Sequence, residues 1–122
     1  MLQLNHANLP VEDVAALSGF FVRHFGFRVA GSRDAGAFVM LRGEDGFLLN
    51  VMKDRPGGGF PRNFHVGFLV ESAEIVRTKH DELSAAGVEV GPVEELSRGG
   101  GRSVTFYCHA PSGILVEVGC EM

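Results

Sequence analysis

Three residues of the chain have side chains that suit metal chemistry and lie in segments that are expected to be strands. His6 stands in the segment 2–9, and His65 and Glu117 stand in segments that alternate between apolar and other residues. Imidazole nitrogens and carboxylate oxygens bind divalent first-row metals, and two histidines with one carboxylate leave positions open for water, substrate or dioxygen. We therefore predict a site for Fe(II), Mn(II), Zn(II) or Ni(II) on His6, His65 and Glu117.

The segment 63–70 shows how such a residue is presented. One face is strongly apolar and consists of alternate residues, Phe64, Val66, Phe68 and Val70. A strand of this kind packs on a core with one face only. His65 lies on the opposite face, where Gly67 leaves room beside it. An imidazole in such a setting is a candidate ligand or acid–base group.

Glu117 has a similar setting in the segment 114–120. Its neighbours on the opposite face are apolar: Ile114, Val116, Val118 and Cys120. We expect a hairpin with the segment 103–109, closed by residues 111–113, which makes Tyr107 the direct partner of Glu117. His109 shares the face of Tyr107 and is a candidate substrate contact.

An internal repeat relates these segments. His6 and His65 are 59 residues apart, Gly26 and Gly87 are 61 apart, and Gly46 and Gly113 are 67 apart. An offset that grows at loops is typical of a duplication with insertions. The offset of 67 makes Asn50 the equivalent of Glu117, and Met40 the equivalent of Tyr107.

Each half should fold as a strand, a helix and three further strands. In the first half, Asp13 caps a helix that runs to about His24 and ends at Gly26. In the second half, Ser72 caps a helix that runs to about Ala86 and ends at Gly87. The strands are expected at 2–9, 27–31, 37–42 and 47–53, and then at 63–70, 88–90, 103–109 and 114–120, with 94–102 as a loop.

The 122 residues suffice for one α+β domain with a real core. We expect module 1 at about 1–53, a linker at 54–62 and module 2 at about 63–122. Glycine clusters at 57–59 and 99–101 indicate two mobile loops. Phe60, beside the first cluster, either covers the site or packs at a dimer seam.

Composition excludes several classes of function. Net charge is −4 and no basic stripe is present, so no nucleic acid partner is expected. No apolar run reaches the roughly 18 residues of a membrane span, and the start of the chain does not read as a signal peptide. The two cysteines have no CxxC spacing, which favours free thiols in a cytoplasmic protein.

The sequence resembles the vicinal oxygen chelate superfamily of glyoxalase I, bleomycin-resistance proteins, fosfomycin-resistance proteins and type I extradiol dioxygenases. The resemblance rests on the opening Asn5-His6, on Phe25-Gly26-Phe27, on His65 and on the run 106–117. In this run the spacing of Phe-Tyr, Ala-Pro-Ser-Gly and Glu is similar to that at the end of the extradiol dioxygenase signature. It implies two tandem βαβββ modules with open, curved mixed sheets, helices on the outer face, and a homodimer. It also implies His6, His65 and Glu117 as the metal ligands.

Departures from the family pattern narrow the function. Glyoxalase I carries a second glutamate where this chain has Asn50, so its classical activity is not expected here. The stretch 97–102 lacks the histidine of extradiol enzymes. Fosfomycin-resistance enzymes use several cationic groups to bind the phosphonate. In this stretch only Arg98 and Arg102 could replace such groups, and we expect both to be solvated loop charges.

The leading hypothesis is a metalloenzyme, a lyase, dioxygenase or transferase, acting on a small oxygen-chelating substrate. Tyr107 would be its catalytic residue, with Asn50 and His109 in contact with substrate. The alternative is a metal-free, bleomycin-resistance-type protein that binds a drug or metabolite. A third possibility is a partner-binding protein with a vestigial metal site.

Overall fold

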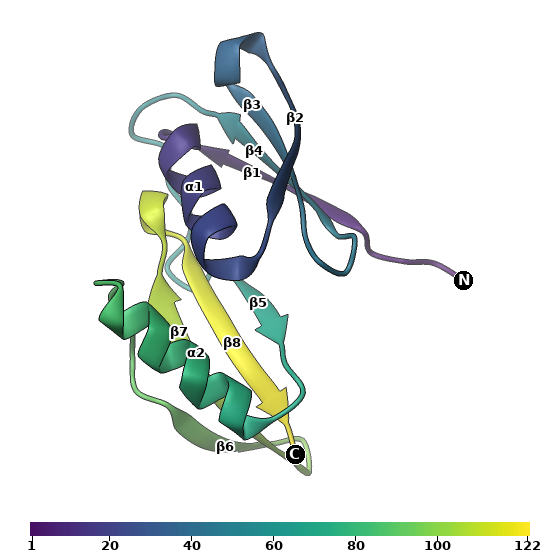
Figure 1. The fold of residues 1–122 in the computed structure, drawn as a ribbon, viewed down its shortest axis with the longest axis vertical. Coiled ribbons are helices and arrows are strands. Elements are labelled where there is room, and N and C mark those ends of the chain that lie inside the picture. The colour runs from purple at the N-terminus through teal and green to yellow at the C-terminus, as the bar shows by residue number, and fades with distance from the viewer. The chain divides into compact units, whose positions relative to one another are not determined.

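The computed structural model describes residues 1–122, all but the side chain of Arg98. The chain forms two compact units, Met1–Gly59 and Phe60–Met122, and each unit contains a four-stranded mixed sheet with an α-helix against it (Figure 1). This arrangement confirms the predicted α+β fold of two tandem βαβββ modules.

Unit 1 has the strand order β1-β4-β3-β2. Strand β1 runs parallel to β4, and the other neighbouring pairs are antiparallel. A single turn of 3₁₀ helix, Asp34–Gly36, joins β2 to β3. The elements are β1 (His6–Val11), α1 (Val14–Phe25), β2 (Arg28–Arg33), β3 (Phe38–Arg42) and β4 (Leu48–Lys53).

Helix α1 begins and ends where its sequence predicts. The Asp13 carboxylate accepts a hydrogen bond from the Ala16 amide at 3.0 Å, which satisfies one of the free N–H groups of the first turn. Gly26 ends the helix in the left-handed conformation, with φ at 70°, which is open to glycine without strain. The helix packs on β3 and β4. Its buried apolar residues are Val14, Leu17, Phe20 and Phe21.

Unit 2 has the matching strand order β5-β8-β7-β6, with β5 parallel to β8. Helix α2 lies across the face of β7 and β8 (Figure 1). The turn between these two strands contains a short 3₁₀ helix, Pro111–Gly113. The elements are β5 (His65–Leu69), α2 (Ala73–Ala85), β6 (Glu94–Arg98), β7 (Gly101–His109) and β8 (Leu115–Glu121).

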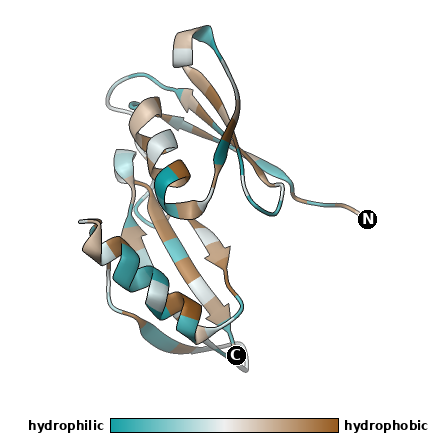
Figure 2. Cartoon of the chain, in the orientation of Figure 1, coloured by the Kyte–Doolittle hydropathy of each residue, from teal (hydrophilic) through white to brown (hydrophobic). Residues whose placement is uncertain are grey.

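The core of unit 2 lies between α2 and one face of its sheet. Hydrophobic and hydrophilic residues alternate along β8 (Figure 2), so Val116, Val118 and Cys120 are buried while Glu117 is on the other face. Phe106, Cys108 and Val104 of β7, with Val76 and Leu83 of α2, complete this core.

Three strand predictions are wrong. Residues 94–98 form β6 rather than a loop; this strand lies at the edge of its sheet and is largely polar, so the sequence has no apolar alternation there. Residues 88–90 contribute only the bridge from Val90 to Cys108. Strand β1 starts at His6 and continues through Pro10, which an edge strand tolerates because an edge residue does not need its N–H for the ladder.

Candidate functional site

The two sheets present equivalent positions in the same register. Tyr107 lies opposite Glu117 in β7–β8, and Met40 lies opposite Asn50 in β3–β4. His6 is level with Leu48, as His65 is level with Leu115. The register therefore confirms two predictions: the repeat equivalence of Asn50 with Glu117 and of Met40 with Tyr107, and the direct pairing of Tyr107 with Glu117 in the hairpin.

In unit 2 the structure brings His65 and Glu117 together. Their strands, β5 and β8, are parallel neighbours, and Glu117 is level with Gly67, two residues beyond His65 on the same face. Beside Gly67, Glu117 Oε1 lies 3.4 Å from His65 Nε2. The His65 side chain is 40% exposed and that of Glu117 is 18% exposed, so solvent reaches the pair mainly at the imidazole.

The tautomer of His65 follows from its second ring nitrogen. His65 Nδ1 lies 3.0 Å from the carbonyl oxygen of Asn63. A carbonyl can only accept, so Nδ1 carries the proton, and in the neutral ring Nε2 keeps its lone pair on the side of Glu117. A histidine that ligates a metal typically has this arrangement, with its other nitrogen bonded to a backbone carbonyl.

Glu117 has a hydrogen-bond donor that we did not predict as a site residue. The Thr105 hydroxyl lies 2.6 Å from Glu117 Oε2, and Thr105 is only 2% exposed. The sequence places Thr105 on the face of Tyr107, two residues earlier along the strand. This position is the one feature of the sequence that could have pointed to Thr105 as a site residue, but it does not show which atom the hydroxyl contacts.

Tyr107 also belongs to this cluster. Its ring stands edge-on to the ring of His65, with centroids 5.6 Å apart and planes at 79°. His65, Tyr107 and Glu117 therefore form one group on the open face of the sheet. With the imidazole nitrogen, the carboxylate and the phenol, this group combines metal-ligand atoms with a hydrogen-bond donor.

His109 and the two arginines are placed differently. His109 Nε2 lies 3.1 Å from the Glu89 carboxylate, and the His109 side chain is 57% exposed. Arg102 pairs with Glu95 at 3.3 Å and is mostly exposed, as a solvated charge would be. The side chain of Arg98 lies outside the described residues.

Unit 1 contains the remaining predicted residues, His6 and Asn50. His6 is exposed, and its Nδ1 lies 2.9 Å from the Asn5 side-chain oxygen, so Nε2 again keeps its lone pair when the ring is neutral. Asn50 is 9% exposed and donates to the Asn8 side-chain oxygen at 2.9 Å. Within the described residues, Asn50 Oδ1 has no hydrogen-bond partner.

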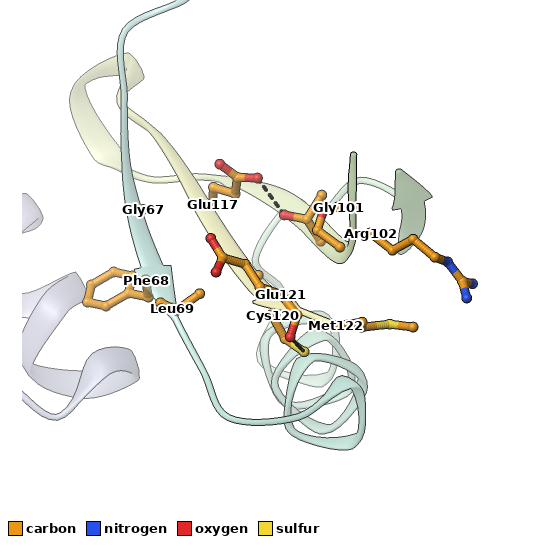
Figure 3. Close-up of a pocket in the computed structure, with 12 residues that line it drawn as sticks. Gly67, Phe68, Leu69, Gly101, Arg102, Glu117, Cys120, Glu121 and Met122 are labelled. Atoms are coloured by element: carbon orange, nitrogen blue, oxygen red, sulfur yellow. Dashed lines mark hydrogen bonds between the residues drawn. The ribbon is translucent and has the colours of Figure 1, made fainter. Parts of the chain in front are cut away.

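A cavity of about 450 Å³ lies beside Glu117 in unit 2. Gly67 and Gly119 line the cavity next to the carboxylate, and Figure 3 shows Leu69 and Met122 along it. The dashed line at Glu117 in Figure 3 marks the hydrogen bond that its carboxylate accepts from the Thr105 hydroxyl. Leu69 is 73% exposed, so the cavity offers an apolar surface close to a carboxylate. Such a combination suits a small ligand with a polar head and an apolar body.

The fit of a metal can be tested on the His65–Glu117 distance. Two ligand atoms at about 2.1 Å from a common metal lie about 3.0 to 3.4 Å apart for angles between octahedral and tetrahedral values. The observed separation of 3.4 Å falls at the upper end of this range. Across the described part of the chain, no three His, Cys, Asp or Glu side chains gather as a metal-binding group. Unit 2 thus contains two residues of the predicted set, and unit 1 contains His6.

No helix in the described chain is both long enough and apolar enough to span a membrane.

Comparison with known proteins places this chain in a family. The model of the Glyoxalase/Bleomycin resistance protein/Dioxygenase superfamily matches residues 3–118. A possible glyoxalase from Bacillus cereus is 36% identical, with 97% of this chain and 98% of that chain covered and a TM-score of 0.82. No curated protein matches the chain.

Two more distant structures share the fold. The fosfomycin resistance protein FosX from Listeria monocytogenes is 21% identical, with 100% of this chain and 95% of that chain covered and a TM-score of 0.76. A glyoxylase/bleomycin resistance protein/dioxygenase domain from Frankia sp. EAN1pec is 18% identical, with 100% and 99% covered and a TM-score of 0.82. Since the family model spans nearly the whole sequence, the chain belongs to the glyoxalase/bleomycin resistance protein/dioxygenase superfamily.

Proposed function

We propose that this protein is a metalloenzyme that binds a divalent metal through His6, His65 and Glu117 and acts on a small substrate with neighbouring oxygen atoms. One observation carries the proposal: His65 Nε2, which keeps its lone pair when the ring is neutral, lies 3.4 Å from Glu117 Oε1. Both atoms are of the type that a first-row divalent metal binds, and their spacing fits a shared metal.

The chain's own residues have distinct parts in this proposal. A bound metal would supply Lewis acidity to oxygen atoms of the substrate. Tyr107, whose ring stands against His65, offers its hydroxyl to an oxygen that gains negative charge. Asn50 in unit 1 is an amide and cannot take a proton as a carboxylate base does, so we do not propose the proton shuttle of glyoxalase I.

We also propose a homodimer as the active form, as superfamily membership favours. Light scattering on the purified protein tests this point. His109 and Asn50 remain proposed substrate contacts: the first lies on the strand of Tyr107, and the second is the repeat equivalent of Glu117.

The test is metal analysis of protein purified without chelator, followed by titration of the metal-stripped protein. We expect one metal per chain in the wild type and a loss of at least about 100-fold in affinity for His65→Ala, because a direct ligand is removed. His24→Ala, which changes a histidine of α1, is the matched control and should bind as the wild type does. Substoichiometric metal in the wild type, together with unchanged binding by His65→Ala, would contradict the proposal.

The apolar side of the cavity supports a second candidate, a metal-free binding protein. Leu69 and Met122 are exposed there, and buried apolar area is the main source of affinity for such ligands. A thermal-shift screen with and without EDTA separates the two. Stabilisation by an aromatic or peptide-like compound that is insensitive to EDTA would favour the binding protein.

A further inference from the structure

We infer that Thr105 is a positioning residue that holds Glu117 so that one carboxylate oxygen, Oε1, is presented beside His65. The inference rests on the proposed metal centre. It assigns to a buried hydroxyl the task of fixing a proposed ligand that would otherwise be free to rotate on its own side-chain bonds.

The contact itself is short and sheltered. Thr105 Oγ1 lies 2.6 Å from Glu117 Oε2, within the range of a charge-assisted O–H···O⁻ hydrogen bond. The same hydroxyl lies 3.1 Å from the Val118 carbonyl oxygen, but it has one proton to donate. The shorter distance and the negative charge direct this proton to Glu117. With Oε2 engaged, Oε1 is the oxygen left on the side of His65.

The backbone register places the hydroxyl there. Thr105 lies opposite Gly119, while its neighbour on the same face, Tyr107, lies opposite Glu117. Thr105 and Glu117 are therefore diagonal neighbours on one face of the antiparallel pair. A Cβ at position 119 would stand 3.1 Å from Thr105 Oγ1, so Gly119 supplies the space that the hydroxyl occupies. A β-branched side chain also has restricted rotation about χ1, which keeps the hydroxyl on its target.

The repeat supplies an independent argument. The equivalents of Thr105, Glu117 and Gly119 in unit 1 are Phe38, Asn50 and Met52, since Phe38 pairs with Met52 and Met40 pairs with Asn50. In that unit the carboxylate is replaced by an amide, and the hydroxyl and the glycine are replaced by large apolar side chains. The same fold is thus built without a threonine at this position, which indicates that Thr105 serves the carboxylate rather than the sheet.

The experiment compares metal affinity in three variants. Thr105→Val keeps the branched shape and removes the hydroxyl, and Thr105→Ser keeps the hydroxyl. Ser103→Ala removes a hydroxyl two residues earlier on the same strand. Each is titrated with Co²⁺, whose visible absorption reports the ligand environment, and with Zn²⁺ in competition with a chromogenic chelator. Circular dichroism of the metal-free proteins verifies that each is folded.

We expect Thr105→Val to bind both metals about 10- to 100-fold more weakly, the range found when a group that orients a ligand is lost. We expect Thr105→Ser to return to within about threefold of the wild type, and Ser103→Ala to bind as the wild type does. If Thr105→Val does not fold, the comparison of Thr105→Ser with Thr105→Ala provides the same test.

Two failures are distinguishable. A wild type that binds metal, with a folded Thr105→Val that binds equally well and has the same Co²⁺ spectrum, overturns the role of Thr105 and leaves the metal centre intact. A wild type that binds no metal overturns the proposed metal centre, and with it the positioning role.

Discussion

Tyr107 and Glu117 are direct cross-strand partners, and Met40 and Asn50 stand in the same relation in the other unit. The two sheets therefore present the same pair of positions with different chemistry. A phenol faces a carboxylate in unit 2, and a thioether faces an amide in unit 1. Because only the carboxylate carries a charge, we expect unit 2 to supply most of the affinity for a cation.

Replacement of Glu117 by glutamine should abolish tight metal binding. The amide keeps the shape of the side chain but loses the negative charge. We therefore expect the affinity for Zn²⁺ to fall by at least about 100-fold, because removal of a residue that only supports a ligand already costs about 10- to 100-fold. Calorimetric titration of the metal-stripped protein measures this. Glu94→Gln, on the exposed strand β6, is the matched control. Equal affinities for the two variants would remove Glu117 from the ligand set.

Loss of the Tyr107 hydroxyl should affect a chelating ligand but not the metal. We expect Tyr107→Phe to bind Zn²⁺ as the wild type does, because the hydroxyl is not a proposed ligand. Its affinity for acetohydroxamate, a small compound with two neighbouring oxygens, should fall about fivefold to tenfold, the cost of one hydrogen bond. Titration of the metal-loaded protein with acetohydroxamate gives the result. An unchanged affinity would exclude Tyr107 as a substrate contact.

The buried thiol of Cys108 should make the protein less stable in alkaline solution. Burial raises the pKa of Cys108 from 9.0 to about 11, and the charge of Lys79 opposes this only in part. The folded state thus disfavours the thiolate. The contribution of the neutral Cys108 thiol to the free energy of unfolding is therefore fully present below pH 9, and it is lost as the pH rises from 9 toward 11.

Urea unfolding of the wild type and of Cys108→Ala at pH 8 and pH 10.5 isolates this effect. The wild type should lose about 2 kcal/mol more than the variant between the two pH values, as expected for a shift of this size. Other groups that titrate in this range affect both proteins alike. A difference in stability that stays constant with pH would show that Cys108 is not responsible.

The Asn8–Asn50 pair should respond unequally to its two substitutions. Asn50 is 9% exposed and donates to Asn8, while its own oxygen has no partner among the described residues. Asn8→Ala leaves the buried amide wholly unpaired and should cost about 1–3 kcal/mol of unfolding free energy. Asn50→Leu removes the buried amide and should change stability by less than about 1 kcal/mol. Chemical denaturation measures both. A neutral Asn8→Ala would show that the hydrogen bond contributes nothing.

Several features of the fold could be predicted from local sequence. Asp13 and Ser72 cap the two helices as expected, since a side-chain oxygen at that position satisfies a free amide of the first turn. The pairing of Tyr107 with Glu117 followed from the length of the turn between their strands. Strand β6 was missed because an exposed edge strand has no apolar face to bury, so no alternation marks it.

The sequence by itself determined which face of each strand bears His6, His65, Asn50 and Glu117, because successive side chains of a strand point to opposite sides. It also determined the duplication that makes these positions equivalent. Only the tertiary structure decided that β5 lies beside β8, which brings His65 Nε2 to 3.4 Å from Glu117 Oε1, and that Thr105 holds the other oxygen. Alternation fixes a face but not a neighbour. The neighbours of a strand are decided by pairing between segments far apart in the chain, and the atoms in contact are decided by side-chain rotation within the packed sheet.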